Sequence, residues 1–122
     1  NSVIEVDLFG QANAEFLDGR QISGAGGLVD FLRGARYSEG GLAITALLST
    51  AKAGAVSRIV PRLSPDAVTI ARADMGLVVS EHGVADLRTA DIEGRARALI
   101  AIADPAHRAG LAPAWDQMRS RM

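Results

Sequence analysis

The sequence predicts a single α/β domain in which helices flank a central sheet. Two nearly unbroken apolar runs, 42–49 and 75–80, have the length that is typical of buried strands. Segments with apolar residues at helical spacing, 27–35 and 92–103, alternate with these runs. A length of 122 residues, with 48% hydrophobic and 22% charged side chains, suits one globular domain. In such folds, ligands collect at the carboxyl ends of the strands.

The amino-terminal half supplies the first strand, the first helix and the first apolar run. Residues 4–8 alternate apolar side chains with Glu5 and Asp7, which predicts a strand whose acidic face is solvated. The short amphipathic helix at 27–35 follows a glycine-rich loop. The run LAITALLS at 42–49 predicts an interior strand covered on both faces, although its periodicity leaves a buried helix as an alternative.

The middle of the chain predicts short extended segments and a second interior strand. Residues 57–63 and 67–71 have extended patterns, and Pro61 confines the first of them to an edge or a bend. The run MGLVVS at 75–80 predicts a buried strand that leads into the turn Glu-His-Gly. The two apolar runs are therefore expected to be interior strands of one sheet.

The carboxyl-terminal part predicts two helices. Residues 92–103 place apolar side chains on one helical face, with Asp91 as the N-cap and Pro105 as the stop. A last helix is expected over about 106–119. No internal repeat or linker interrupts this order of elements.

Composition excludes several classes of function. A net charge of −1 and an aromatic content of 4% argue against a nucleic-acid partner. No apolar run reaches the roughly 18–20 residues that span a bilayer, so we expect a cytoplasmic protein without a membrane partner. Zero cysteines and two distant histidines argue against disulfides and a metal site. The chain opens on a strand pattern without an initiator methionine, so we expect further polypeptide before Asn1.

The glycine-rich loop before the first helix is a candidate ligand loop. Gly24, Gly26 and Gly27 permit positive φ angles and close approach of backbone to a ligand. Free amides at a helix N-terminus favour a phosphate or a developing oxyanion. The dinucleotide fingerprint would need glycine where Val29 stands, and the P-loop lysine is missing as well. Two interpretations stay open, a phosphate- or oxyanion-binding loop and a turn that only lets helix and strand pack.

Other polar residues also have two interpretations. Ser38 lies in an incomplete esterase elbow, because an arginine replaces its first glycine. Ser80, Glu81 and His82 are consecutive, and neighbouring side chains of an extended chain point to opposite faces. Glu81 follows a buried strand, where α/β folds place functional groups, yet a carboxylate there also satisfies turn amides. Lys52 is the only lysine, and it either meets an anionic ligand or is simply solvated.

Five segments, taken in order, resemble the C-terminal part of the acetyl-CoA hydrolase/transferase family, which includes 4-hydroxybutyrate CoA-transferase. They are GQANAEF (10–16), GAGGLVDFLRGARYSEGGLAI (24–44), STAKAGAVSRIVPRL (49–63), VVSEHGVADLR (78–88) and RARALIAIADPAHRAGL (95–111). The resemblance spans nearly the whole chain without large gaps. Two positions depart from it, since Leu42 stands where a lysine is expected and Thr89 where a glycine is expected. The missing lysine removes one possible phosphate contact.

The resemblance implies a fold and a chemistry. Residues 1–122 would be the C-terminal domain of a CoA-transferase or acyl-CoA hydrolase, a three-layer open sheet of the NagB/RpiA/CoA-transferase type with flanking helices. A glutamate attacks an acyl-CoA thioester, CoA returns to form a glutamyl thioester, and a second carboxylate or water then releases CoA. The family's nucleophilic glutamate lies upstream of Asn1, so no residue of this chain is expected to be the nucleophile.

The resemblance also assigns expected contacts. Gly24, Gly26, Gly27 and Lys52 match positions near coenzyme A, which would be a substrate and not a permanent cofactor. Glu81 and His82 match a TEYG-like turn near the active site. The expected partners are an acyl-CoA, a small carboxylate, the missing N-terminal domain and further copies in a homo-oligomer, and an exposed apolar patch should mark an interface. The alternative is a free-standing CoA-binding or scaffolding module without catalysis.

Overall fold

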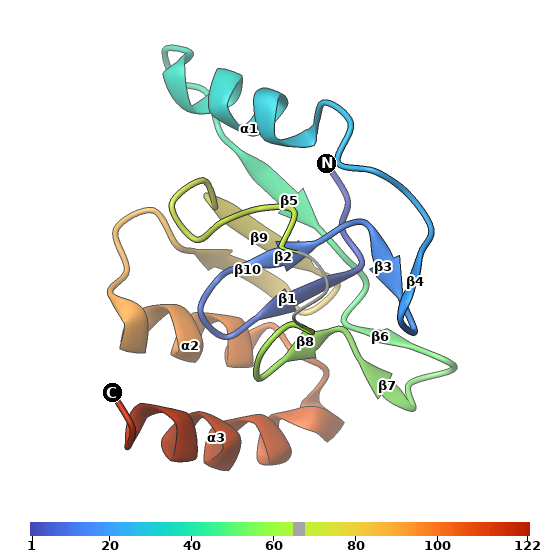
Figure 1. Cartoon of the computed structure of the whole chain (residues 1–122). Coiled ribbons are helices and arrows are strands. Elements are labelled where there is room, and N and C mark those ends of the chain that lie inside the picture. The colour runs from blue at the N-terminus through green and yellow to red at the C-terminus, as the bar shows by residue number, and fades with distance from the viewer. Residues whose placement is uncertain (65–67) are drawn as a thin grey trace.

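The computed structural model describes residues 1–64 and 68–122 and places the strands between helix α1 and the helix pair α2 and α3 (Figure 1). Helix α1 lies on one side of the strands, and α2 and α3 lie together on the other side. The helices are α1 (Leu28–Tyr37), α2 (Ile92–Ala101) and α3 (Pro105–Arg119). The strands are β1 (Glu5–Asp7), β2 (Ala12–Asn13), β3 (Phe16–Leu17), β4 (Arg20–Gln21), β5 (Ile44–Ala46), β6 (Thr50–Ala51), β7 (Val56–Ser57), β8 (Ile59–Val60), β9 (Leu77–Ser80) and β10 (Gly83–Asp86). The predicted α/β class with flanking helices is confirmed.

The strands of the described residues form two small sheets and two short hairpins. One sheet has the order β2-β1-β8, and the other has the order β10-β9-β5, in which β5 and β9 run parallel. The hairpins are β3-β4 and β6-β7. The amino-terminal segment joins the two sheets, because Ser2 bridges Ala46 and the N–H of Val3 donates to the Ala46 carbonyl at 3.0 Å. The chain then continues directly into β1.

Both apolar runs form strands, as predicted, but their surroundings differ. The run 75–80 contains β9, the central strand of its sheet, with Val78 fully buried. The run 42–49 contains β5, which pairs with β9 on one side and with residues 1–3 on the other. The expected strands at 42–49 and 75–80 therefore lie side by side within the fold.

The expectation that 42–49 is covered on both faces is wrong for the described chain. Its residues alternate strictly, so that Ala43, Thr45, Leu47 and Ser49 are buried. On the other face, Leu42, Ile44 and Leu48 are 48%, 41% and 71% exposed. The apolar composition predicted that other elements pack on both faces of this strand, but the described residues pack on only one face.

The acidic face predicted for the first strand is also wrong, because Asp7 is fully buried. Its Oδ1 accepts hydrogen bonds from the backbone N–H groups of Phe9 and Gln11, both at 3.0 Å. Its Oδ2 accepts from the Gln11 side chain at 2.9 Å and from the N–H of Leu63 at 3.3 Å. A charge can be buried when several donors replace water, so Asp7 organises the turn after β1 instead of facing solvent.

The segments between β6 and β9 fit their predictions in part. Within 57–63, β8 is an edge strand, as the proline that follows it required. The expected extended segment 67–71 begins at a residue that lies outside the described residues. Of its described part, Ile70 is buried and bridges Ala12.

The helices follow the sequence closely, with one correction. The predicted N-cap of α2 is confirmed, because Asp91 accepts from the N–H of Gly94 at 2.7 Å. Pro105 does not stop α2, which ends at Ala101; it occupies the first turn of α3, where a missing N–H costs nothing. Asp104 caps that helix by accepting from Ala106 at 2.9 Å.

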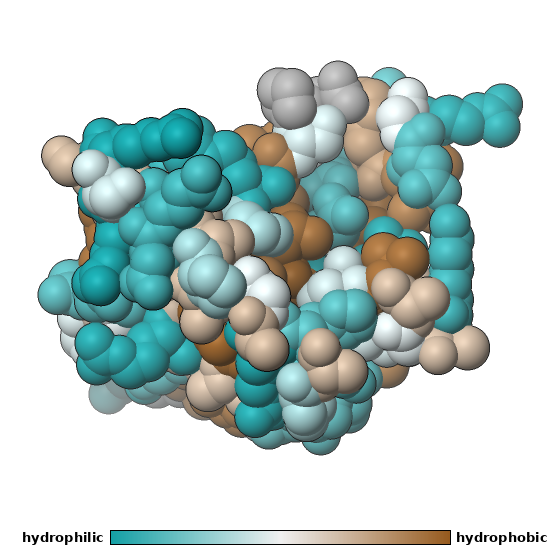
Figure 2. Space-filling view, turned by 90° about the horizontal axis from the view of Figure 1, so that it is seen from below, coloured by the Kyte–Doolittle hydropathy of each residue, from teal (hydrophilic) through white to brown (hydrophobic). Residues whose placement is uncertain are grey.

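The core lies between the sheets and the helices. Trp115 of α3 packs edge-on against Phe9, with ring centroids 5.4 Å apart, and thereby joins α3 to the turn after β1. Seen from below, the side on which α2 and α3 lie is mostly hydrophilic, with hydrophobic residues in a hollow near its middle (Figure 2). No helix of the described residues is both long and apolar enough to cross a bilayer.

Candidate functional site

The carboxyl ends of the parallel strands β5 and β9 place Glu81 beside Ser49. Glu81 follows β9 directly, and Ser49 lies three residues beyond β5. The backbone N–H of Ser49 donates to Glu81 Oε1 at 2.8 Å, and the hydrogen bonding from Ser49 holds the pKa of the Glu81 carboxyl below its ordinary value. Glu81 is therefore a carboxylate at neutral pH, fixed at the edge where α/β folds bind ligands.

Ser49 carries a second polar group that has no partner among the described residues. Its backbone bonds to Glu81, but its buried hydroxyl makes no hydrogen bond within that part of the chain. An unpaired buried hydroxyl costs about 1–3 kcal/mol, and such groups are worth explaining when they lie beside a candidate site. Sequence reasoning missed Ser49, although a polar residue just after an apolar strand was the available signal.

His82 extends the group of titratable side chains around this turn. Its Nε2 lies 3.7 Å from Glu81 Oε1 and 3.6 Å from Asp104 Oδ2. Ser80 and His82 do not form a nucleophile and base pair. The Ser80 hydroxyl instead donates to the Ile102 carbonyl at 2.6 Å and accepts from the His82 backbone N–H at 3.0 Å. Asp104, which the sequence analysis did not single out, brings the start of α3 to the same turn.

Lys52 lies at the tip of the β6-β7 hairpin, which begins one residue after Ser49. Lys52, Ala53 and Gly54 all have positive φ angles, of 51°, 53° and 91°. A hydrogen bond of 2.8 Å between His107 Nε2 and the Gly54 carbonyl attaches this tip to α3. The Lys52 carbonyl accepts from the N–H of Ala55 at 3.1 Å, but within the described chain its exposed side chain makes no hydrogen bond or ion pair, so its ammonium is available to an anion.

The glycine loop lies at the N-terminus of α1. Gly26 has a φ of 53°, and a Cβ at Gly24 or Gly26 would meet no atom within 4 Å. Gly27 is the N-cap and offers no side chain to the first turn; the N–H of Leu28 donates to the Ala25 carbonyl at 3.2 Å, and the other amides there are free for another acceptor. The positive φ accounts for glycine at 26 as a turn residue, whereas neither packing nor a positive φ accounts for Gly24, so both the ligand-loop and the turn interpretation stay open.

Two shallow pockets connect the glycine loop with the base of the Lys52 hairpin. One, of about 340 Å³, is lined by Gly24, Gly27 and Phe31 together with Ser2. The other, of about 450 Å³, is lined by Ser2, Leu48, Thr50 and Ala51 among others. Because Ser2 lines both, they adjoin along the amino-terminal segment.

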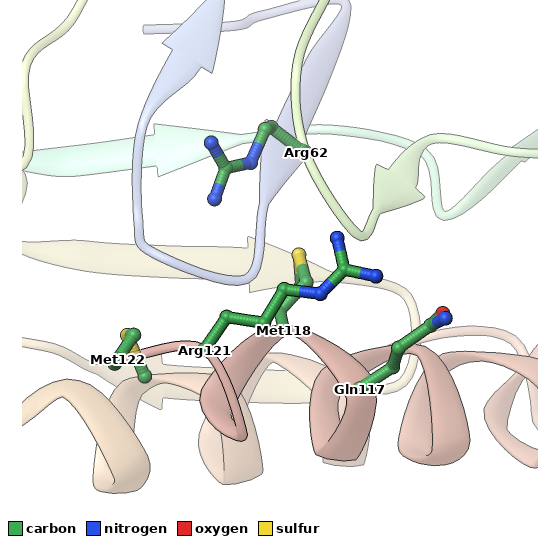
Figure 3. Close-up of a pocket in the computed structure, with 5 residues that line it drawn as sticks. All are labelled: Arg62, Gln117, Met118, Arg121 and Met122. Carbon is green, nitrogen blue, oxygen red and sulfur yellow. The ribbon is translucent and has the colours of Figure 1, made fainter.

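A third hollow, of about 410 Å³, involves none of the predicted site residues. Arg62 faces Met118 of α3 and Arg121, which follows that helix, across it (Figure 3). Among residues 1–64 and 68–122, neither hydrogen bonds nor ion pairs join these side chains to the turn of Glu81. The structure thus gathers Glu81, His82 and Ser49 at one turn, whereas the glycine loop lies on a pocket whose lining includes none of these three residues.

Comparison with known proteins shows which family the chain belongs to. Residues 1–114 match the model of the acetyl-CoA hydrolase/transferase C-terminal domain. The chain is 52% identical over 112 residues to 4-hydroxybutyrate coenzyme A transferase of Clostridium kluyveri, covering 91% of this chain and 26% of that protein. It is 46% identical to succinyl-CoA:cyclohexane-1-carboxylate CoA transferase of Geobacter metallireducens, covering 97% and 27%.

Solved structures agree with these relatives. RipA from Yersinia pestis superimposes with a TM-score of 0.91 at 40% identity, covering 98% of this chain and 27% of that one. 4-Hydroxybutyrate CoA-transferase from Porphyromonas gingivalis gives 0.76 at 44% identity, covering 100% and 26%. The chain spans about a quarter of the length of these relatives. It belongs to the acetyl-CoA hydrolase/transferase family and corresponds to that family's C-terminal domain.

Proposed function

We propose that this chain is the C-terminal domain of a CoA-transferase that moves CoA from an acyl-CoA thioester to a small carboxylate. The observation that carries the proposal is the Glu81–Ser49 pair at the carboxyl ends of β5 and β9, and the uncapped glycine loop on its own pocket is a second feature that supports it. The family membership supports the same reaction class. Coenzyme A is a substrate in this proposal, and no permanently bound cofactor takes part.

The proposed chemistry begins on a glutamate upstream of Asn1, in a missing N-terminal domain. Its carboxylate oxygen attacks the thioester carbonyl carbon, the C–S bond breaks, and CoA leaves as a thiolate. The thiolate then attacks the glutamyl carbonyl of the resulting anhydride, which releases the first carboxylate and leaves a glutamyl thioester. The acceptor carboxylate reverses both steps and departs as the new acyl-CoA, while attack by water would instead hydrolyse the thioester.

This chain supplies binding and polarisation in that scheme. The free amides around Gly26 and Gly27 donate to the oxygen that becomes negative when the thioester is attacked. Lys52 offers a compact positive charge to a phosphate of CoA or to a carboxylate. Glu81, ionised and fixed by Ser49, lies at the edge of this site as a charged boundary and is not the nucleophile.

The first test replaces the proposed CoA contacts in the full-length enzyme. Gly26→Val fills the space that the loop leaves open and should lower acyl-CoA turnover. Gly19→Val is its matched control, because Gly19 also has a positive φ, of 74°, and open space around it, but lies in the β3-β4 turn. Lys52→Ala should raise KM for CoA esters more than it lowers kcat, whereas Arg20→Ala on β4 should change neither. Unchanged kinetics at both 26 and 52 would remove these residues from the site.

The second test uses residues 1–122 alone with acetyl-CoA and a carboxylate acceptor. The isolated chain should neither transfer nor hydrolyse CoA, because half of a site between domains lacks the nucleophile and many contacts. Covalent adducts are sought by mass spectrometry. Turnover that disappears on Glu81→Ala would show that the nucleophile lies in this chain and not upstream.

A free-standing CoA-binding or scaffolding module is the alternative, and the parent reading frame distinguishes the two. The transferase requires several hundred further residues upstream that contain the glutamate, whereas the module requires none. In the transferase proposal, the full enzyme is a cytoplasmic homo-oligomer. Size-exclusion chromatography with light scattering of the full-length protein tests that assembly.

A further inference from the structure

The sheet β10-β9-β5 has one face that no described element covers. Register places Ile44 opposite Leu77, and Ala46 opposite Val79, which in turn lies opposite Val84. These residues share one face, because side chains alternate between the faces of a sheet. Val84 is 60% exposed, whereas Thr45, Val78 and Ala85 on the opposite face are buried. We call the exposed side, with Leu42, Ile44, Leu48 and Val84 as its most exposed members, the outer face.

The composition of the outer face is that of a buried surface. Apart from Asp86, which lies opposite Leu77, its exposed members are large aliphatic side chains, and Leu77, Val79 and Ala46 continue the apolar surface between them. When one face of a sheet is solvated, the side chains on that face are normally polar. Strands that are apolar on both faces are typical of sheets that other elements cover on both sides. An ion pair between Asp86 and Arg88, 2.7 Å long, stands at one end of the outer face. An apolar centre with a charged rim is the usual anatomy of an interface.

The path of the chain indicates which segment could pack on the outer face. The amino group of Asn1 donates to the Ile44 carbonyl at 3.0 Å, and its carbonyl accepts from the N–H of Ala46 at 2.7 Å. Any polypeptide that precedes Asn1 would therefore arrive at the edge of this same sheet, next to Ile44. The chain covers only about a quarter of its relatives' length, so a large upstream segment would start at that edge.

We propose that, in the full-length protein, polypeptide preceding Asn1 packs apolar helix surface onto the outer face. Helices are the elements that cover sheets with parallel strands, and β5 and β9 are parallel. A second copy of the chain is the competing occupant, and the position of Asn1 at the edge of this sheet, next to Ile44, favours upstream polypeptide instead. This inference rests on the proposed function, since only a longer enzyme has upstream polypeptide.

The test uses the absence of cysteine from residues 1–122. Val84→Cys and, separately, Ile44→Cys are made in the full-length protein and treated with a maleimide, with modified peptides identified by mass spectrometry. Tyr37→Cys is the control, because Tyr37 is 86% exposed at the end of α1 and does not belong to the outer face. Each labelling rate is measured in native buffer and divided by the rate in urea.

Positions 84 and 44 should react at least about tenfold more slowly in the native protein, because the reagent then needs local opening, while position 37 should react at nearly its urea rate. Native labelling at 84 and 44 as fast as at 37 would overturn the inference. Protection that disappears on dilution would also overturn it, in favour of a second copy. A reading frame without an upstream segment would refute the proposed function, whereas an upstream segment that leaves position 84 open would refute only this inference.

Discussion

Replacing Asp7 by alanine should cost the fold about 4 kcal/mol. The substitution leaves three backbone N–H groups, those of Phe9, Gln11 and Leu63, without the acceptor they have now. Each buried donor without an acceptor destabilises the fold by about 1–3 kcal/mol, and values near the lower end of this range for the three donors add up to about 4 kcal/mol. The Gln11 side chain is only partly buried and turns to water at little cost.

Asp7→Asn separates the charge from the hydrogen bonds. Asparagine keeps one acceptor oxygen for the N–H groups of Phe9 and Gln11, but its amide NH₂ then faces the donors of Gln11 and Leu63. We expect a loss of about 1–2 kcal/mol for this variant. Glu39→Ala, at an exposed position, is the surface control and should stay within about 0.5 kcal/mol of the parent.

The assay is urea unfolding followed by the fluorescence of Trp115, the only tryptophan, whose ring lies against Phe9 in the same turn. With a slope of about 1.5 kcal/mol per molar urea, Asp7→Ala should lower the midpoint by roughly 2–3 M. The reasoning fails if Asp7→Ala costs less than about 1 kcal/mol, or if the alanine and asparagine variants lose equal stability.

Three further predictions concern the helices and the candidate site. Asp91→Ala removes the N-cap of α2 and should lower the free energy of unfolding by about 1 kcal/mol, measured by denaturation. Gly34→Ala lies inside α1, where an added Cβ meets nothing within 4 Å, and should raise that free energy by about 0.5–1 kcal/mol. Because folding depresses the pKa of Glu81, the hydrogen bonding from Ser49 stabilises the fold fully above the ordinary pKa of a glutamate, and this stabilisation is lost as the pH falls through the lower folded pKa. Glu81→Gln should flatten this acid loss in pH-dependent unfolding, and an unchanged pH profile would contradict it.

Elements with strong periodicity and local chemistry were predictable from the sequence. The cap at Asp91 and the strand that ends before Glu81 depend on near neighbours in the chain, and both are confirmed. Pro105 was misassigned because proline is compatible both with the end of one helix and with the first turn of the next. Because α2 ends at Ala101 and Asp104 already caps the next helix, Pro105 lies in the first turn of α3.

Long-range partners could not be predicted from the sequence. Asp7 has the alternation of a solvated strand residue, and its burial depends on Leu63, which is distant in the chain. Ser49 gains its importance from Glu81, thirty-two positions away. The roles of Gly24, Gly26, Gly27 and Lys52 in binding CoA stay predictions, since they depend on a ligand and on upstream polypeptide.

The hairpin tip at Lys52 has a consequence for the entropy of binding. Lys52 and Ala53 both hold a left-handed backbone conformation, which costs L-residues about 1 kcal/mol or more each. This cost is incurred once, at folding, so the backbone that carries the ammonium is already ordered before an anion arrives. The bond between His107 and Gly54 keeps that order by joining the tip to α3. Ala53→Gly would relieve this backbone strain, but it would also let the backbone at Lys52 sample more conformations in the absence of an anion. Binding would then cost more conformational entropy, so the less strained loop would hold an anion less tightly.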